Sequence, residues 1–550
     1  MQLDGLFAYF LFPFALDREA IQQDHPKAWT GKTKWLDGLD AWMADKRHQG
    51  QQLRRLGTWK RATYSEFHAG SQAYSDLLFF NSIVRHVFFD TNIGRHPDEQ
   101  ENQLRCFSIE IPSPQRLWFE GSDAIGGSGR AEIKDLRLYI SAHGTGILSI
   151  EVETGAIDSQ QALWLMRRLR KLYPLDGSGV RDGRTPNRLA LLLEVEGQIE
   201  TLCEERFEDP KMVGFYPPLA SVIRSLLYFA DYNHQEYEPV LDENMMVYSY
   251  GELNMQTCRD TLDNGGMDVV EEFLFLRHLH GDAACYESSH SSMLIGFTGH
   301  SCALLHVKSC EATDQSRLRV VCGSQRVVKR EDLDVCKMFH TNFYLMAVVA
   351  IFYRAILMDF SERSALVARH LLRDQQSGTL SLASIQLVNE FRAQFLNFSG
   401  YWHFDDLSCK QADNDFFRRL CREYRVDDMK EVIGSELRHM TEFVYNFYQL
   451  RNTEAVNRLA MLSLVFGGGA VLTGFFGMNF GREFANILFE GQGMGSMLHY
   501  SLIAFISTFV FGSLALGTYV VLRSWRDYLA LLTPLKKTPT TSSLKRESPE

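Results

Sequence analysis

The residues with the most distinctive chemistry in this 550-residue chain form the tripeptide Gly477-Met478-Asn479, which follows a long uncharged stretch. The Asn479 carboxamide supplies a neutral oxygen acceptor, and Gly477 lets the chain turn sharply just before it. Neutral acceptors suit a hydrated divalent cation that holds its water tightly, such as Mg²⁺. Gly and Asn are also favoured at helix C-caps, and the two interpretations are compatible because the cap would aim the asparagine.

Two uncharged segments, 459–476 and 497–522, frame this tripeptide and must position it. Each is long enough to cross a bilayer as a helix, the first because it extends the helix that precedes it. An apolar stripe with helical spacing starts near Asn414, and no proline occurs between Pro239 and Pro534. We therefore predict one unbroken stalk helix that runs from Asn414 into the first span.

The flanking charges predict the orientation of the two spans. Basic residues crowd their outer ends (Arg451, Arg458, Arg523, Arg526, Lys536 and Lys537), whereas the loop between them holds only Arg482. The positive-inside rule then places both termini in the cytoplasm and the loop outside. The sequence predicts a multi-pass protein of the cell (inner) membrane, with the lipid bilayer as a partner.

The N-terminal part reads as a mixed α/β domain. Alternating apolar residues predict strands at 107–111, 133–140 and 147–154, and the last two should form an antiparallel hairpin. Leu163, Met166, Leu169 and Leu172 predict a helix, and further strand candidates are 246–250, 292–297, 303–307 and 317–322.

Two apolar runs in this part resemble membrane or targeting segments, and we assign both to the interior of the domain. Residues 6–16 lack the basic flank of a signal peptide and are expected to form a buried strand and turn. Residues 343–353 are too short for a span and are interrupted by Arg354, so a buried helix is expected.

The predicted organisation has six parts. They are a cytoplasmic α/β domain (1–330), a helical region ending in the stalk (331–456), the first membrane helix (457–479), an outer loop (480–496), the second membrane helix (497–522) and a basic tail expected to be disordered (523–550).

Gly-Met-Asn at the outer end of the penultimate membrane helix, before a loop and a last helix with a basic tail, resembles the CorA magnesium-transporter superfamily. The motif resemblance covers roughly residues 453–526, and the cytoplasmic part matches in layout only. The resemblance implies a homopentameric funnel, a central pore lined by the first span, and a selectivity filter at Gly477, Met478 and Asn479. It implies no cofactor and no catalysis, with Mg²⁺ transported or regulatory and Zn²⁺, Co²⁺ or Ni²⁺ as alternatives.

Small or β-branched residues follow one face of the first span in steps of three and four. They are Thr453, Val456, Ala460, Ser463, Gly467, Ala470 and Gly474. A spacing of 3.5 residues is what helices arranged in parallel around an axis require. The resemblance assigns this face to the pore, and tight helix–helix packing is the alternative.

The sequence departs from better-known members of the superfamily at three points. Gly467-Gly468-Gly469 lies where bulkier apolar residues commonly form a gate, so a constriction is expected at Val456 or Leu459. Phe476 stands in place of a frequent tyrosine. The outer loop contains only two acids, Glu483 and Glu490, so we expect it to attract cations weakly.

Four acids, Asp405, Asp406, Asp413 and Asp415, cluster near the start of the predicted stalk. In related proteins acidic residues between subunits bind regulatory magnesium, and these are the candidates here. The competing interpretation is a solvated acidic cap on a helix N-terminus.

Composition and motifs exclude several other classes. A net charge of −11 argues against a nucleic-acid partner, and no catalytic constellation or zinc-binding pattern is present. Three hypotheses remain: a gated divalent-cation channel, an exporter of Zn²⁺ or a similar ion that uses His499, and a non-conducting membrane-anchored sensor or scaffold.

Overall fold

The computed structural model describes most of the N-terminal part and the helices up to residue 477. The described ranges are 1–16, 35–44, 59–62, 79–88, 104–111, 113–123, 126–171, 187–206, 221–226, 237–239, 244–253, 267–275, 284–287, 293–307, 335–377 and 380–477, with single positions elsewhere, several of them between 500 and 519.

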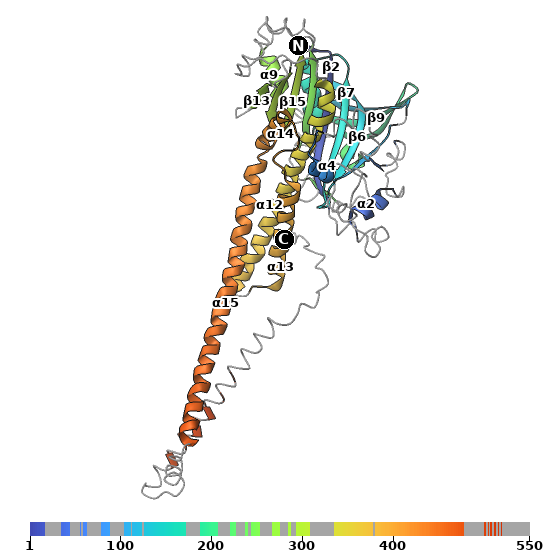
Figure 1. The fold of residues 1–550 in the computed structure, drawn as a ribbon. Helices are drawn as coiled ribbons and strands as arrows, with labels where there is room; N and C mark the ends of the chain where they lie inside the picture. Colours follow the sequence, from blue (N-terminus) through green and yellow to red (C-terminus); the bar gives the residue numbers. More distant parts are fainter. Residues whose placement is uncertain are drawn as a thin grey trace. The chain divides into compact units, whose positions relative to one another are not determined.

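A thirteen-stranded, mostly antiparallel sheet dominates the described N-terminal part (Figure 1). Its main strands lie in the order β10 (Gln198–Arg206), β9 (Arg188–Val195), β5 (Arg116–Ser122), β6 (Ser128–Ile140), β7 (Thr145–Thr154), β2 (Gly5–Leu16), β12 (Met246–Leu253), β15 (Ser301–Val307), β14 (Met293–Thr298) and β13 (Ala284–Glu287). Three short strands, β3 (Lys60–Arg61), β4 (Arg105–Ser108) and β11 (Tyr237–Pro239), pair beside this path. β12 and β15 pair in parallel. The mixed α/β character predicted from the sequence is confirmed.

The predicted hairpin is confirmed, because β6 and β7 pair antiparallel with Leu138 opposite Leu148. The N-terminal apolar run forms a single long strand, β2, with no turn within it. β2 lies between β7 and β12, where its apolar side chains are buried on both faces. The strand predicted at 317–322 and the position Leu172 lie outside the described residues.

One face of the sheet is covered by short helices, mainly α5 (Ser159–Leu169) and α9 (Met267–Phe275). Asp158 begins α5 as its N-cap, because its carboxylate accepts a hydrogen bond from the Gln160 amide at 2.9 Å. Gly296 of β14 lets α9 approach closely, since a Cβ there would lie 2.5 Å from the Leu274 carbonyl oxygen. The core of the domain lies in this layer.

The opposite face of the sheet carries aromatic residues that pack on a helical segment. This segment consists of α11 (Val335–Met338), the π-helical turn η5 (Phe339–Phe343) and α12 (Tyr344–Ser377). Tyr9 of β2 stacks on Tyr344 with ring centroids 4.2 Å apart. The run 343–353 is buried here, as the sequence predicts.

The prediction of one unbroken helix from Asn414 is wrong. The structure has two helices, α14 (Gln411–Glu423) and α15 (Val426–Gly477), separated by Tyr424 and by Arg425, whose φ is +55°. This left-handed conformation breaks the helical hydrogen-bond ladder and changes the direction of the chain. The sequence pattern hides the break because no proline or glycine marks it and apolar residues continue on both sides of it.

The chain divides into two compact units. One comprises Met1–Arg369 and Asn389–Glu436, and the other comprises His370–Val388 and Leu437–Glu550. Helix α13 (Leu382–Asn397), followed by the π-helical turn η6 (Phe398–Trp402), contributes residues to both. The domain boundaries drawn from the sequence, the two-helix membrane hairpin and the pentamer stay predictions.

Candidate ion pathway

The candidate pathway lies along α15, a 52-residue helix about 78 Å long at the usual rise per residue. Asp427 and Asp428 occupy its first turn, where acidic side chains complement the helix dipole. In its first half Ile433, Leu437 and Met440 are buried, which confirms the apolar stripe predicted there. This half therefore behaves as an ordinary amphipathic helix.

The second half of α15 is uncovered, and from Leu459 onward it is also apolar. From Tyr448 to Ser463 every side chain except Leu462 is exposed. Leu450, Leu459 and Met461 show 68%, 64% and 70% of their surface. A helix of this composition needs lipid or further protein around it, because contact between so much apolar surface and water is unfavourable.

The stripe of small residues lies on this uncovered part. Its described members are all exposed, namely Thr453, Val456, Ala460, Ser463, Gly467, Ala470 and Gly474. A Cβ added at Gly467 or Gly474 would meet no other atom within 4 Å. Among the described residues, none therefore fills the space beside the stripe.

Both hydroxyl groups of the stripe are held by the helix itself. Thr453 Oγ1 donates to the Gln449 carbonyl at 2.8 Å, and Ser463 Oγ donates to the Leu459 carbonyl at 2.9 Å. With its proton committed to the backbone, each oxygen presents only lone pairs outward. The two positions thus provide neutral acceptors, the ligand type already attributed to Asn479.

Helix α15 ends at Gly477. Met478 and Asn479 lie outside the described residues, so the filter motif, Gly477 included, stays a sequence prediction. The same holds for the outer loop, for His499 and for most of the second predicted span. Tyr500, Thr508, Phe511 and Tyr519 within that span are described as helical, and Thr508 Oγ1 donates to the Ala504 carbonyl at 2.7 Å.

Among the described residues one helical segment, Val335–Gln376, is long and apolar enough to span a membrane. Its most apolar window is 83% buried inside the protein. It is better explained as a core helix that packs on the sheet than as a membrane helix.

The four acidic residues are spread over two different environments rather than gathered into one site. Asp405 exposes 85% of its side chain, and Asp406 and Asp415 both contact Arg418, at 2.7 and 3.7 Å. The described residues of the chain include no group of three His, Cys, Asp or Glu side chains placed to hold a metal ion. A regulatory role between subunits stays a prediction.

Asp413 differs from its three neighbours. Only 2% of the residue is exposed, and its carboxylate accepts a hydrogen bond from Ser408 Oγ at 3.0 Å. Asn414 in turn supports Ser408, because its side-chain oxygen Oδ1 accepts a hydrogen bond from the Ser408 backbone amide at 2.9 Å. Asp413 therefore fixes the loop before α14 and is neither a solvated cap nor an open ligand.

Sequence reasoning missed the polar continuation of the stripe. Further steps of four and three from Thr453 reach Gln449, Asn446 and Glu442, all of which are exposed. They lie about half a turn around the helix from the buried Leu437 and Met440. Extending the same spacing toward the N-terminus would have found them.

Comparisons with known proteins add little to this geometry. A scan of protein-family models found no match, and a search of curated proteins found none either. Among solved structures, the complete structure of the CorA magnesium transporter from Methanocaldococcus jannaschii is similar at 10% sequence identity and a TM-score of 0.19. The similar region covers 54% of this chain and 92% of that chain. A TM-score this low carries no weight for the fold or the function.

Proposed function

We propose that this chain is a membrane-embedded divalent-cation channel that moves Mg²⁺ through a pore lined by the C-terminal half of α15. The observation that carries the proposal is the change of character along one helix. Its first half buries an apolar stripe, whereas its second half is exposed, apolar from Leu459 onward and marked by small residues at a spacing of 3.5. Lipid would cover the apolar surface, and further copies of the chain would enclose the stripe.

The ligand chemistry along the stripe suits a hydrated ion. Thr453 and Ser463 present hydroxyl lone pairs, and Asn479 supplies a carboxamide at the predicted outer mouth. Water molecules bound to Mg²⁺ donate hydrogen bonds, so neutral acceptors can hold the hydrated ion without removing its shell. Gln449, Asn446 and Glu442 would continue a polar lining into a cytoplasmic vestibule.

The glycines shape the expected conduction path. Gly467 removes side-chain bulk in mid-span, so the narrowest point of the pore is expected about two to three turns closer to the cytoplasm, at Val456 or Leu459. A membrane potential of 100 mV, negative inside, would favour entry of a divalent ion by about 4.6 kcal/mol, twice the value for a single charge. No coupled energy source is needed for uptake.

The wider features of the proposal follow the resemblance in sequence. The assembly would be a homopentamer in the cell (inner) membrane, with both termini in the cytoplasm and the motif on the outer side. Zn²⁺, Co²⁺ and Ni²⁺ are alternative cargoes.

The test is ion entry into liposomes that contain the purified full-length protein, followed with fluorescent indicators for Mg²⁺ and Zn²⁺. Wild type is compared with Asn479→Ala and with Asn389→Ala, a matched control at an exposed asparagine of α13, outside α15. We expect Mg²⁺ entry that Asn479→Ala abolishes and Asn389→Ala retains. Zinc movement that follows a proton gradient would favour the exporter. No ion movement by well-folded oligomers would favour the anchored sensor or scaffold.

A further inference from the structure

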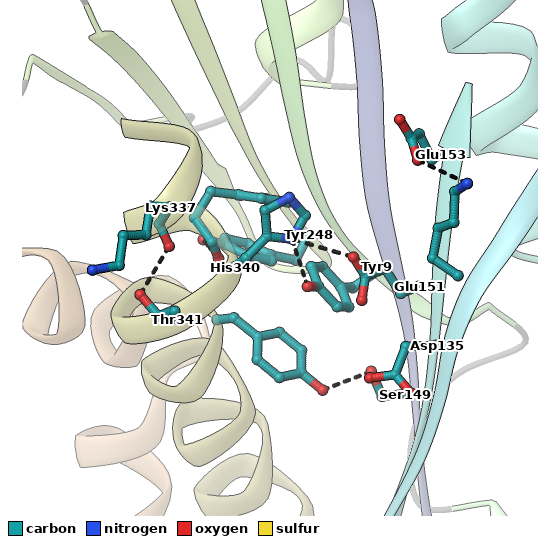
Figure 2. A network of polar contacts seen from close by, with 12 residues as sticks. Tyr9, Asp135, Ser149, Glu151, Glu153, Tyr248, Lys337, His340 and Thr341 are labelled. Atoms are coloured by element: carbon teal, nitrogen blue, oxygen red, sulfur yellow. Dashed lines mark hydrogen bonds and ion pairs between the residues drawn. The ribbon is translucent and has the colours of Figure 1, made fainter. Parts of the chain in front are cut away.

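A cluster of polar side chains joins the sheet to the π-helical turn η5 (Figure 2). His340 projects from η5 toward two neighbouring strands, β2 and β7. Its ring lies edge-on to Phe7, with centroids 5.0 Å apart and planes at 89°. The imidazole is partly buried, so its environment restricts its position and still admits solvent protons.

Two side chains share one nitrogen of His340. The Tyr9 hydroxyl lies 2.8 Å from Nδ1, and a Glu151 carboxylate oxygen lies 3.2 Å from the same atom. In a neutral imidazole Nδ1 can accept a hydrogen bond from the Tyr9 hydroxyl, and the Glu151 carboxylate then faces an uncharged ring. A protonated imidazole carries a hydrogen on both nitrogens, and its positive charge then forms an ion pair with Glu151.

The tyrosines around this imidazole stay uncharged. Burial raises the pKa of Tyr9 well above its usual value, and the nearby Glu151 raises it further. Burial likewise raises the pKa values of Tyr248 and Tyr344. All three stay neutral under physiological conditions, so they serve as hydrogen-bonding and packing groups.

The remaining charged groups near η5 have partners of their own or lie further along the segment. Arg137 of β6 pairs with Asp135, their atoms 2.6 Å apart, and Lys134 bridges to Glu153 at 3.2 Å. Lys337 of α11 precedes His340 by three residues, and its carbonyl accepts a hydrogen bond from Thr341 Oγ1. Histidine is the side chain that ordinarily changes charge between about pH 5 and 8.

The turn that His340 holds is an irregular one. A π-helical turn is rare, and such turns occur often at functional positions. Tyr248 supports η5 from β12 by donating to the Phe339 carbonyl at 3.2 Å. The His340–Glu151 contact is the link between η5 and β7 whose strength depends on charge. We propose that His340 is a proton-operated clamp that fastens η5, and with it the start of α12, to β2 and β7, tightly when the imidazole is charged and loosely when it is neutral.

Hydrogen exchange of the full-length protein, followed by mass spectrometry at pH 5.5 and 8.5 and corrected for the intrinsic effect of pH on exchange, tests the clamp. In the wild type, peptides covering residues 335–344 should exchange at least about threefold more slowly at pH 5.5 than at pH 8.5. His340→Gln and Glu151→Gln should each remove this difference, because each removes the charge pair by a separate route. His86→Gln, at an exposed histidine of α4 (Ser82–Phe88), should retain it.

Two outcomes overturn the clamp: a wild type whose corrected exchange in this segment is independent of pH, or a pH dependence that survives both variants. Glu151→Gln leaves the imidazole in place, so it decides the matter if His340→Gln fails to fold. The readout does not involve ion movement, so it is independent of the channel proposal.

Discussion

The rings of Tyr353 and His403 stack with centroids 4.9 Å apart and planes inclined by 23°. Tyr353 also donates to the Trp402 carbonyl at 2.7 Å and accepts from the Phe404 amide at 2.9 Å, so it holds both sides of His403 in place. Lys430 Nζ lies 3.1 Å from His403 Nδ1. Burial, followed by the Lys430 charge, lowers the pKa of His403 despite two carboxylates nearby.

This environment predicts a pH-dependent stability. The pKa of His403 is lower in the folded chain than its ordinary value of 6.5, so the folded state binds fewer protons between the two values. The free energy of unfolding is then highest above about pH 6.5 and falls as the pH drops toward the folded pKa. We expect the unfolding temperature of the full-length protein to fall between pH 7 and 5, and His403→Gln to flatten that slope. An unchanged slope in His403→Gln, with His86→Gln as the control, would contradict the assignment.

A larger side chain in the middle of the stripe should distinguish the two interpretations of the stripe, pore lining and helix packing. Gly467→Val places a branched side chain on the stripe, whereas Gly469→Val places the same side chain about 200° around α15. If the stripe lines a pore, we expect Gly467→Val to reduce Mg²⁺ entry by about tenfold or more with the oligomer intact. Gly469→Val should conduct normally. Loss of the oligomer in Gly467→Val, measured by its mass in detergent, would instead favour the packing interpretation.

The Thr453 hydroxyl, which donates to the Gln449 carbonyl, predicts that ion entry requires an oxygen at this position rather than a branched side chain. Thr453→Val keeps the branched shape and removes the acceptor, so we expect ion entry to fall several-fold, by about 1 kcal/mol of lost interaction. Thr453→Ser should restore it, because serine can form the same bond to the Gln449 carbonyl. Equal entry rates for Thr453→Val and wild type would show that this hydroxyl does not contact the hydrated ion.

The contrast between Asp413 and Asp405 predicts opposite consequences of removing each carboxylate. Asp413→Ala removes the buried carboxylate that accepts from Ser408 Oγ, leaving only the Phe79 carbonyl at 3.1 Å as its acceptor, and should destabilise the protein by about 1–3 kcal/mol. Asp405→Ala removes an exposed group and should leave the unfolding temperature nearly unchanged. Thermal unfolding of both variants, with and without Mg²⁺, checks this. A Mg²⁺-dependent shift that Asp405→Ala alone abolishes would support a regulatory site.

Local patterning predicted much of the sheet domain. The alternation in 133–140 and 147–154 identified β6 and β7 because one face of each strand lies against the core. The apolar run that forms β2 was assigned correctly to the interior, since its buried position between β7 and β12 requires apolar side chains on both faces.

The features that the sequence did not predict depend on residues far apart in the chain or on single backbone angles. Tyr9 and His340 are separated by 331 positions, and no local pattern indicates that β2 meets η5. Arg425 adopts its left-handed conformation within an otherwise helical pattern, and arginine is not a residue type that signals it. The burial of Asp413 depends on Ser408, itself held by Asn414, folding back on it, which composition cannot reveal.

The uninterrupted course of α15 has a consequence for its evolution and for its engineering. The angle between the buried Leu437 and Met440 and the exposed stripe is set only by the number of residues between them. One inserted residue after Asn446 would rotate everything beyond it by about 100°, although no side chain had been replaced. Seven inserted residues would restore the phase to within about 20°. The number of residues between these two parts of α15 is therefore constrained as strongly as the identity of any residue on the helix.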